Sequence, residues 1–133
     1  MTTRTAAHVV ASYLETLDVY SDLNATFVFG DNLYIGNVLG DSDADEALTI
    51  VLYLGEPPIT DRQTAAMQLC FKSTSRQTAI CLMQRLINEL DNSGLNGAGK
   101  MKATSSNPIL FPATEGGEKI VSMASFTLKH VKI

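Results

Sequence analysis

Between Met67 and Leu90 the spacing of apolar residues changes from every second position to every third or fourth. Over 67–73 the alternation of apolar residues with polar or small ones predicts a strand with one face toward a core. From Ala79 to Leu90 the apolar residues lie on one stripe of a helix. Because the connector is too short to let the two elements separate, their apolar faces must meet. The stretch therefore predicts a sheet strand with a helix folded back against it.

Polar residues mark both ends of this helix. Thr74 and Gln77 have the T-x-x-Q spacing of a capping box, in which the hydroxyl and the side-chain amide satisfy free backbone N–H groups. At the other end, Gly94 follows Asp91 and Asn92 and is expected to close the helix.

The residues before this unit predict one helix and three strands. Residues 3–17 carry an amphipathic helical stripe, and 26–29 and 33–39 predict a hairpin around a Gly-Asp-Asn turn. The apolar, β-branched run 47–54 is typical of a central strand covered on both faces. Gly55 to Pro58 are expected to stop that strand, because proline cannot donate to a sheet ladder.

The last third of the chain combines a polar segment with a final strand. Residues 93–118 are rich in glycine, serine, asparagine and proline and predict a long flexible loop, with one weak strand at 101–104. Residues 120–133 predict a strand whose alternation changes phase, which indicates a β-bulge near Ala124 and Ser125. Together the elements predict one α+β domain over the whole chain, with a small mixed, mainly antiparallel sheet and two helices, in the order α-β-β-β-β-α-(loop)-β.

Charge is distributed unevenly along the chain. The formal net charge is −4 over 133 residues, but residues 1–61 sum to −9 and residues 62–133 sum to +5. Either the fold averages these charges over its surface, or the protein has an acidic flank and a basic flank. The second arrangement suits head-to-tail contact between copies, which closes into a ring if the rotation permits.

No catalytic, metal-binding or cofactor-binding pattern is complete. The segment 94–101 fits G-x-x-x-x-G-K but has methionine where a hydroxyl should bind Mg²⁺, and 41–46 lacks the glycine and glutamate of a calcium loop. Cys70 and Cys81 have no histidine beside them in sequence and are expected to be small apolar fillers in a reducing compartment. We therefore expect a protein that is not an enzyme and takes no metal or cofactor.

The lysines of the last third lack the interleaved aromatic residues on which bases stack, so they are expected to be solvated. In a protein that lines a passage for DNA, such lysines would suffice to attract phosphates without sequence preference. No apolar run approaches membrane-spanning length, and we expect a soluble protein of the cytoplasm.

Residues 50–92 combine an apolar strand, a G-E-P-P turn, the alternating strand MQLCFKS and a helix with the pattern S-x-x-x-A-x-x-L-x-x-x-L-x-x-x-L. In this order they resemble the tail terminator, or minor capsid, proteins of tailed bacteriophages. Proteins of that family have a leading helix, a small mixed sheet, this strand-helix unit and a final strand.

The resemblance implies a structural protein of the virion neck, assembled in the host cytoplasm as a homohexameric ring. Such a ring caps the tail tube, ends tail polymerisation and joins the tail to the head connector. Its implied partners are other copies of itself, the tail tube protein, and the head connector or stopper protein. Genomic DNA would pass through the channel without sequence-specific binding, and no membrane would be involved.

Two contact surfaces follow as hypotheses from the resemblance and the charge distribution. Acids of one copy would meet bases of the next, and the G-E-P-P turn and the polar segment would contact neighbouring rings. The subunit interface would use Asp41, Asp43, Asp45 and Glu46 with Arg62, Lys72, Arg76 and Arg85, and the ring-to-ring contact Gly55, Glu56, Pro57, Pro58, Lys100 and Lys102. The alternatives are another neck component, such as a head-completion or stopper protein, and a small cytoplasmic ligand-binding domain or enzyme.

Overall fold

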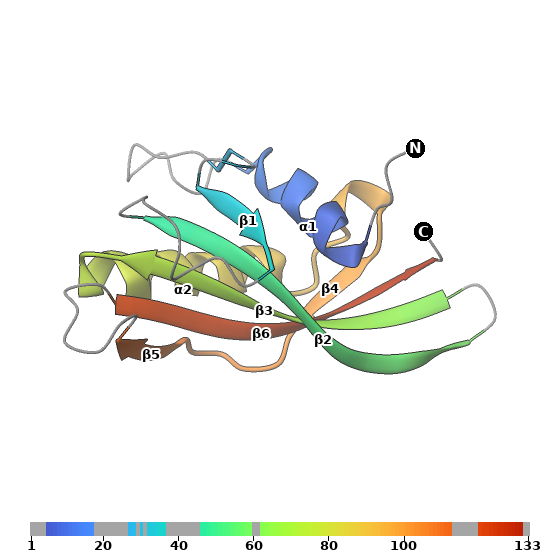
Figure 1. The fold of residues 1–133 in the computed structure, drawn as a ribbon. Helices are drawn as coiled ribbons and strands as arrows, with labels where there is room; N and C mark the ends of the chain where they lie inside the picture. Colours follow the sequence, from blue (N-terminus) through green and yellow to red (C-terminus); the bar gives the residue numbers. More distant parts are fainter. Residues whose placement is uncertain are drawn as a thin grey trace.

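The computed structural model describes residues 5–17, 27–28, 30, 32–36, 46–59, 62–112 and 120–131. In these residues two α-helices, α1 (Ala6–Leu14) and α2 (Arg76–Leu90), pack on a six-stranded, mostly antiparallel sheet (Figure 1). The predicted α+β class is confirmed. The strands are β1 (Leu33–Ile35), β2 (Ala47–Ile59), β3 (Arg62–Ser73), β4 (Lys100–Ala103), β5 (Ile109–Pro112) and β6 (Ile120–Val131), and a 3₁₀ helix, η2 (Leu95–Gly97), precedes β4.

The strand order is β1-β2-β3-β6-β4, and β5 also pairs with β6. β1 runs parallel to β2, and every other pairing is antiparallel. β3 and β6 pair without interruption from Arg62 opposite Val131 to Ser73 opposite Ile120. The predicted bulge in the last strand is therefore wrong. Its phase change has another cause: Val121 is buried on one face of β6 while Phe126 and Leu128 are buried on the other.

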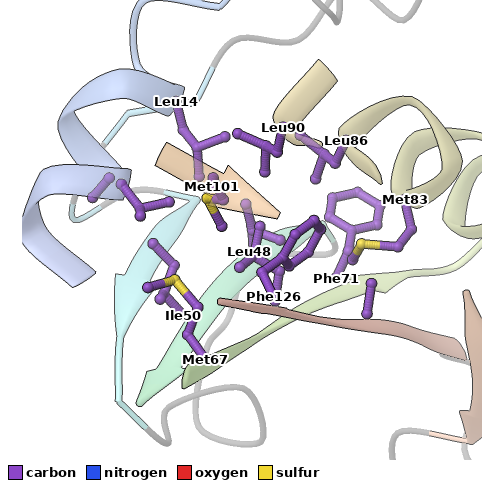
Figure 2. Packing of buried hydrophobic residues seen from close by; sticks show 14 of the residues in the cluster. Leu14, Leu48, Ile50, Met67, Phe71, Met83, Leu86, Leu90, Met101 and Phe126 are labelled. Atoms are coloured by element: carbon purple, nitrogen blue, oxygen red, sulfur yellow. The ribbon is translucent and has the colours of Figure 1, made fainter. Parts of the chain in front are cut away.

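The hydrophobic core lies between the helices and one face of the sheet. Figure 2 shows Leu86 and Leu90 of α2 directed toward Leu48, Phe71 and Phe126 of the central strands. On each central strand every second residue belongs to this core, as the alternation over 67–73 predicts. Full burial of one such large side chain contributes roughly 1.5–3 kcal/mol. The core therefore holds both helices on the same face of the sheet.

The start of α2 is capped one residue later than predicted. The Ser75 hydroxyl oxygen accepts a hydrogen bond from the Thr78 N–H at 3.2 Å, and the Ser75 N–H donates to Ser73 Oγ at 3.0 Å. Ser73 thus does for the cap residue what Gln77 does in a capping box. The prediction of Thr74 and Gln77 is wrong because two neighbouring serines supply the same hydrogen bonds.

The end of α2 also differs from the prediction. Asn92, not Gly94, takes the left-handed conformation after the helix, with φ +63°. Asparagine tolerates this region better than most residues. The Asn92 N–H donates to the Met101 carbonyl oxygen at 2.8 Å, so the chain reverses at once toward β4.

β2 does not stop at the G-E-P-P segment as predicted but continues to Ile59. The pairing with β3 shifts between Tyr53 and Glu56 and again between Glu56 and Ile59. On its other side β2 is paired with β1 only as far as Ile50. The prolines therefore lie on an edge strand. Proline is tolerated there because no described neighbouring strand needs its N–H for a hydrogen bond.

The predicted hairpin of 26–29 and 33–39 is not formed by its described residues. Only Leu33–Ile35 form a strand, and it pairs with β2 in parallel. The Val28 N–H donates to the Asn32 side-chain oxygen at 2.7 Å, and the Gly30 N–H donates to the Leu33 carbonyl oxygen at 2.9 Å. These bonds close a turn, and the ladder groups of β1 go to β2.

The segment predicted as one long loop, 93–118, contains secondary structure in its described part, 93–112. η2 comes first, β4 confirms the weak strand predicted at 101–104, and β5 is an additional strand. Both strands pair with β6, with Lys100 opposite Lys129 and Ile109 opposite Met123. Long-range pairing with β6 compensates for a local sequence that favours turns.

Candidate functional site

The sheet order places residues of opposite charge at opposite edges of the sheet. β1 and β2 at one edge contain a single charged residue, Glu56, and the exposed Glu46 immediately precedes β2. β4, β5 and β6 at the other edge contain three exposed lysines, Lys100, Lys102 and Lys129, and no acid. The charge imbalance between the two halves of the sequence thus becomes an imbalance across the sheet.

Only some of the residues predicted for the subunit interface are both described and exposed. Asp41, Asp43 and Asp45 lie outside the described residues. Lys72 is 3% exposed and is therefore not a surface base of the chain. Arg62 and Arg76 are exposed, but Arg62 begins β3 and Arg76 begins α2 beyond the other end of β3, a strand roughly 36 Å long at about 3.3 Å per residue.

Arg85 is exposed on α2, which leaves three predicted bases on the surface but not in one cluster. A single short acidic segment of a neighbouring copy cannot contact all of them together. If the predicted ion pairs form, they can therefore involve only some of these bases.

The predicted ring-to-ring residues are brought to one end of the sheet. Glu56 lies opposite Thr64 on β3, Thr64 opposite Lys129 on β6, and Lys129 opposite Lys100 on β4. This row crosses four strands, about 14 Å at roughly 4.8 Å per strand spacing. The hairpin of β2 and β3, with residues 55–58 in it, extends past the helices at this end (Figure 1).

The outer edge of β4 is already occupied by the residues that follow α2. The Ala103 N–H donates to Asp91 Oδ1 at 3.0 Å, and the Met101 N–H donates to the Ser93 carbonyl oxygen at 2.9 Å. In return the Asn92 N–H donates to the Met101 carbonyl oxygen. β4 is therefore protected against pairing with another strand.

Besides the outer side of β1, the end strand of the sheet, two stretches of strand edge have no strand partner in the described part of the chain. β2 has no partner on its outer side after Ile50, whose carbonyl oxygen accepts from the Gly36 N–H at 2.9 Å. The backbone of β5 pairs with β6 and with no other described strand. Exposed large apolar residues lie on these same strands: Leu52 is 39% exposed, Tyr53 46% and Ile109 59%.

Sequence reasoning missed these open edges. Leu52 and Tyr53 belong to the apolar run 47–54, which predicts coverage on both faces, but the structure buries 47–50 and leaves Leu52 and Tyr53 exposed. Ile109 lies in the segment predicted as a loop. No sequence signal marked the β2 edge, because the neighbouring strand was predicted over 33–39 and only the structure gives its described part as Leu33–Ile35.

The two cysteines have different environments. Cys70 is buried on β3, and this burial raises the pKa of its thiol, so it is the apolar filler that the sequence predicts. Cys81 is exposed on α2, where the filler interpretation is wrong. In the described ranges no group of three or more histidine, cysteine, aspartate or glutamate side chains is arranged as a metal site requires.

The two histidines lie at the start of α1 and near the end of β6. His8 Nδ1 accepts a hydrogen bond from the Thr5 N–H at 3.0 Å and lies 2.9 Å from Thr5 Oγ1, which closes the start of α1. His130 is buried near the end of β6, opposite Gln63 on β3.

The glycine-rich segment 94–101 does not have the geometry of a phosphate-binding loop. It connects α2 through η2 to β4, whereas a phosphate loop leaves a strand and opens a helix. The Gly97 and Gly99 N–H groups both donate to the Gly94 carbonyl oxygen, at 2.9 and 3.4 Å. The backbone donors that would hold a phosphate thus close the turn itself.

A groove of about 350 Å³ lies between the end of α2 and the connection from β4 to β5. Asp91 supplies its one ionisable side chain and already accepts from the Ala103 N–H. The Thr104 hydroxyl donates to the Ser125 carbonyl oxygen and the Ser105 hydroxyl to that of Asn107, so neither is paired with Asp91 as a nucleophile is with its base. The lining residues of the groove are Ile87, Asn88, Asp91, Ala103, Thr104, Ser105 and Ser106.

Compared with known proteins, the chain matches no protein-family model and no curated sequence. Of the helices described, none has the length and apolar character needed to cross a lipid bilayer. The features that carry a functional argument are therefore the charged and open edges of the sheet.

Proposed function

We propose that this chain is a structural virion protein of a tailed phage, which forms a ring on the tail tube, ends tube polymerisation and joins the tail to the head connector. The observation that carries the proposal is the separation of charge between the two edges of one sheet. β1 and β2 contain Glu56 and no base, and β4, β5 and β6 contain Lys100, Lys102 and Lys129 and no acid.

Complementary edges favour a head-to-tail contact, because the acidic edge of one copy attracts the basic edge of the next. Such a contact uses two different surfaces of each protomer and repeats around an axis, so it closes into a ring at the appropriate rotation. Single surface ion pairs contribute only about 0–1 kcal/mol. Charge would thus set the orientation of the copies, and buried contact area would supply most of the affinity.

The element order agrees with the resemblance seen in the sequence. The strand, the G-E-P-P segment, the alternating strand and the helix form β2, β3 and α2 in direct succession. A leading helix precedes them, and β6 follows as a long final strand. The resemblance adds the biological setting, and the charged edges add a physical reason for assembly.

Negative-stain microscopy of the purified chain tests the ring, and addition of the chain to polymerising tail tubes tests the cap. The proposal expects rings with a central channel and tubes that stop growing with a ring at one end. Replacing Cys81 with serine is expected to change neither result. Particles without rings, both alone and on tubes, would contradict the proposal.

The ionic contribution is tested by two double variants that change net charge equally. Lys100→Gln with Lys102→Gln removes the lysines of β4, and Arg76→Gln with Arg85→Gln removes two exposed bases of α2. We expect the first pair to weaken association in low salt and the second to have the smaller effect. Neutralising Asp41, Asp43, Asp45 and Glu46 together should act like the first pair. An unchanged sedimentation profile of the four-acid variant in both low and high salt would refute ionic pairing.

A further inference from the structure

The open part of β2 faces away from β3 on the long hairpin. β1 covers β2 only at Leu48 to Ile50, so the outer backbone groups of 52–59 have no strand partner in the described part of the chain. Tyr53 is exposed beside this edge on the face opposite the helices, since it lies opposite Ala66, whereas the neighbouring Met67 belongs to the core under the helices. An exposed apolar edge of this kind is a template for strand addition.

On the opposite side of the sheet, β5 is the only described strand whose outer edge is open. β4 is blocked by Asp91, Asn92 and Ser93, through three hydrogen bonds of 2.8 to 3.0 Å. β5 has no such cover, and its Ile109 has the highest exposure of the exposed large apolar residues. Ile109 lies opposite Met123, so its side chain is on the same helix-free face as that of Tyr53.

We propose that copies of this chain join by strand addition, with β5 of one copy pairing with the open part of β2 in the next copy. The sheet then continues from copy to copy. This inference rests on the proposed function, because a ring requires one heterologous contact repeated around an axis.

The strand directions allow this pairing without turning a protomer over. β2 is antiparallel to β3, β3 to β6 and β6 to β5, so β5 runs antiparallel to β2. Two copies placed side by side in the same orientation therefore present β5 and β2 as an antiparallel pair, whose hydrogen bonds form directly across the edge.

The pairing requires neighbouring copies to be displaced along the strands. Ile109 is level with Met123, Cys70 and Thr49 across the sheet, and β1 covers β2 as far as Ile50. For 109–112 to pair with the uncovered residues 52–55, Ile109 must lie six residues farther along β2 than Thr49. At about 3.3 Å per residue the displacement is roughly 20 Å. A constant shift between neighbouring strands is the geometry by which tilted strands close around an axis.

Charge complementarity favours a neighbouring copy of this chain as the occupant of the β2 edge. The open strand of β2 contains Glu56, and the β5 side of the sheet carries Lys100 and Lys102 on β4. A symmetric pairing of β2 with β2 would instead bring two Glu56 residues to the same edge. It would also end at a dimer, because both open β2 edges would be used.

Lysine substitutions at the open edges test the inference. Tyr53→Lys and Ile109→Lys place a charge at each edge, and Ile80→Lys is the matched control because Ile80 is exposed on α2, away from both edges. Association is measured by sedimentation, and folding by thermal unfolding. We expect each edge variant to associate about tenfold more weakly or worse, with unfolding like that of the wild type, and Ile80→Lys to associate normally.

Cross-linking provides a second measurement that does not depend on loss of association. In a Cys81→Ser background, Tyr53→Cys and Ile109→Cys variants are mixed and treated with a short bis-maleimide. The inference expects cross-linked dimers in the mixture only, and a ladder up to the full ring when one chain carries both substitutions. Tyr53→Cys cross-linking to itself would overturn the proposed pairing in favour of a symmetric one.

The outcomes separate this inference from the proposed function. Strand addition is overturned, and the ring proposal left standing, if rings persist in both lysine variants and the cysteine variants give no 53-to-109 cross-link. Strand addition is also overturned if the wild type stays monomeric at all concentrations and the cysteine variants give no cross-link. Capping of tail tubes then decides the proposed function separately.

Discussion

Replacing Gly99 with alanine is expected to destabilise the fold, because β4 approaches β6 too closely there for a side chain. A Cβ atom at Gly99 would lie 2.7 Å from the carbonyl oxygen of Lys129, 3.0 Å from Leu128 Cδ1 and 3.1 Å from His130 Cβ. The nearest of these atoms belongs to the backbone of β6, which is held between β3 and β4. It cannot move away without separating strands, so the substitution must push β4 outward.

The expected cost is about 2–3 kcal/mol, the upper part of the range for overpacking a closely packed site. For a chain of 133 residues this corresponds to a fall in melting temperature of roughly 6–12 °C. Urea unfolding followed by circular dichroism measures the change in free energy. Gly94→Ala is the matched control, because its nearest atom, the carbonyl oxygen of Gly99, is 3.9 Å away and its φ is −85°.

The control is expected to be neutral or slightly stabilising, by up to about 1 kcal/mol, since alanine restricts the unfolded chain more than glycine does. A surface substitution usually changes the free energy of unfolding by no more than about 0.5 kcal/mol. If Gly99→Ala changes it by no more than that, the close packing of β4 on β6 is refuted. The candidate site would be affected as well, because Lys100 and Lys102 are positioned by this packing.

Three further predictions concern single residues. Ser75→Ala should cost about 1 kcal/mol by removing the acceptor of the Thr78 N–H, whereas Thr74→Ala should cost less; equal losses in urea unfolding would contradict Ser75 as the cap. Asp91→Ala should cost about 0.5–1.5 kcal/mol by freeing the Ala103 N–H and should speed hydrogen exchange of that amide, with Glu89→Ala as the unaffected control. Burial raises the pKa of the Cys70 thiol above its ordinary value of 9.0, so its contribution to stability is complete below pH 9 and is lost as pH rises through the folded-state pKa. Wild type should therefore lose stability in alkaline solution relative to Cys70→Ala, and parallel pH profiles of the two proteins would contradict this.

The parts of the fold that sequence reasoning predicted are those where local pattern and tertiary packing agree. The alternation over 67–73 and the helical stripe to Leu90 became β3 and α2, with the expected faces in the core. The fold class follows from such strongly patterned segments. Cap positions were less predictable, because Ser73 and Ser75 offer the same hydrogen bonds as Thr74 and Gln77.

The parts that were missed depend on partners distant in sequence. Pro57 and Pro58 are compatible with a strand only because β2 has no outer neighbour there, a fact of topology and not of local sequence. β5 consists of four residues in a polar segment and is defined by its pairing with β6. For the candidate site, the charge imbalance was visible in the sequence, but only the strand order assigns it to two edges, and only burial removes Lys72 from the surface.

An open, apolar strand edge exposes a protein to uncontrolled aggregation unless something limits how far another strand can pair. On β2 the limit is set by Pro57 and Pro58, which lack the N–H groups needed to extend a ladder. Before them the open edge has room for a short partner only, and β5 is four residues long and itself ends in Pro112. Residues 91–93 close the outer edge of β4 by hydrogen bonds. In the described part of the chain, the opposite side of the sheet therefore has no open strand that is longer than β5. Replacing Pro57 and Pro58 with valine should thus extend the open edge and convert ordered association into precipitation at equal concentration, while the melting temperature of the soluble fraction stays near that of the wild type. A variant that remains as soluble and as regularly assembled as the wild type would show that the prolines do not limit pairing at this edge.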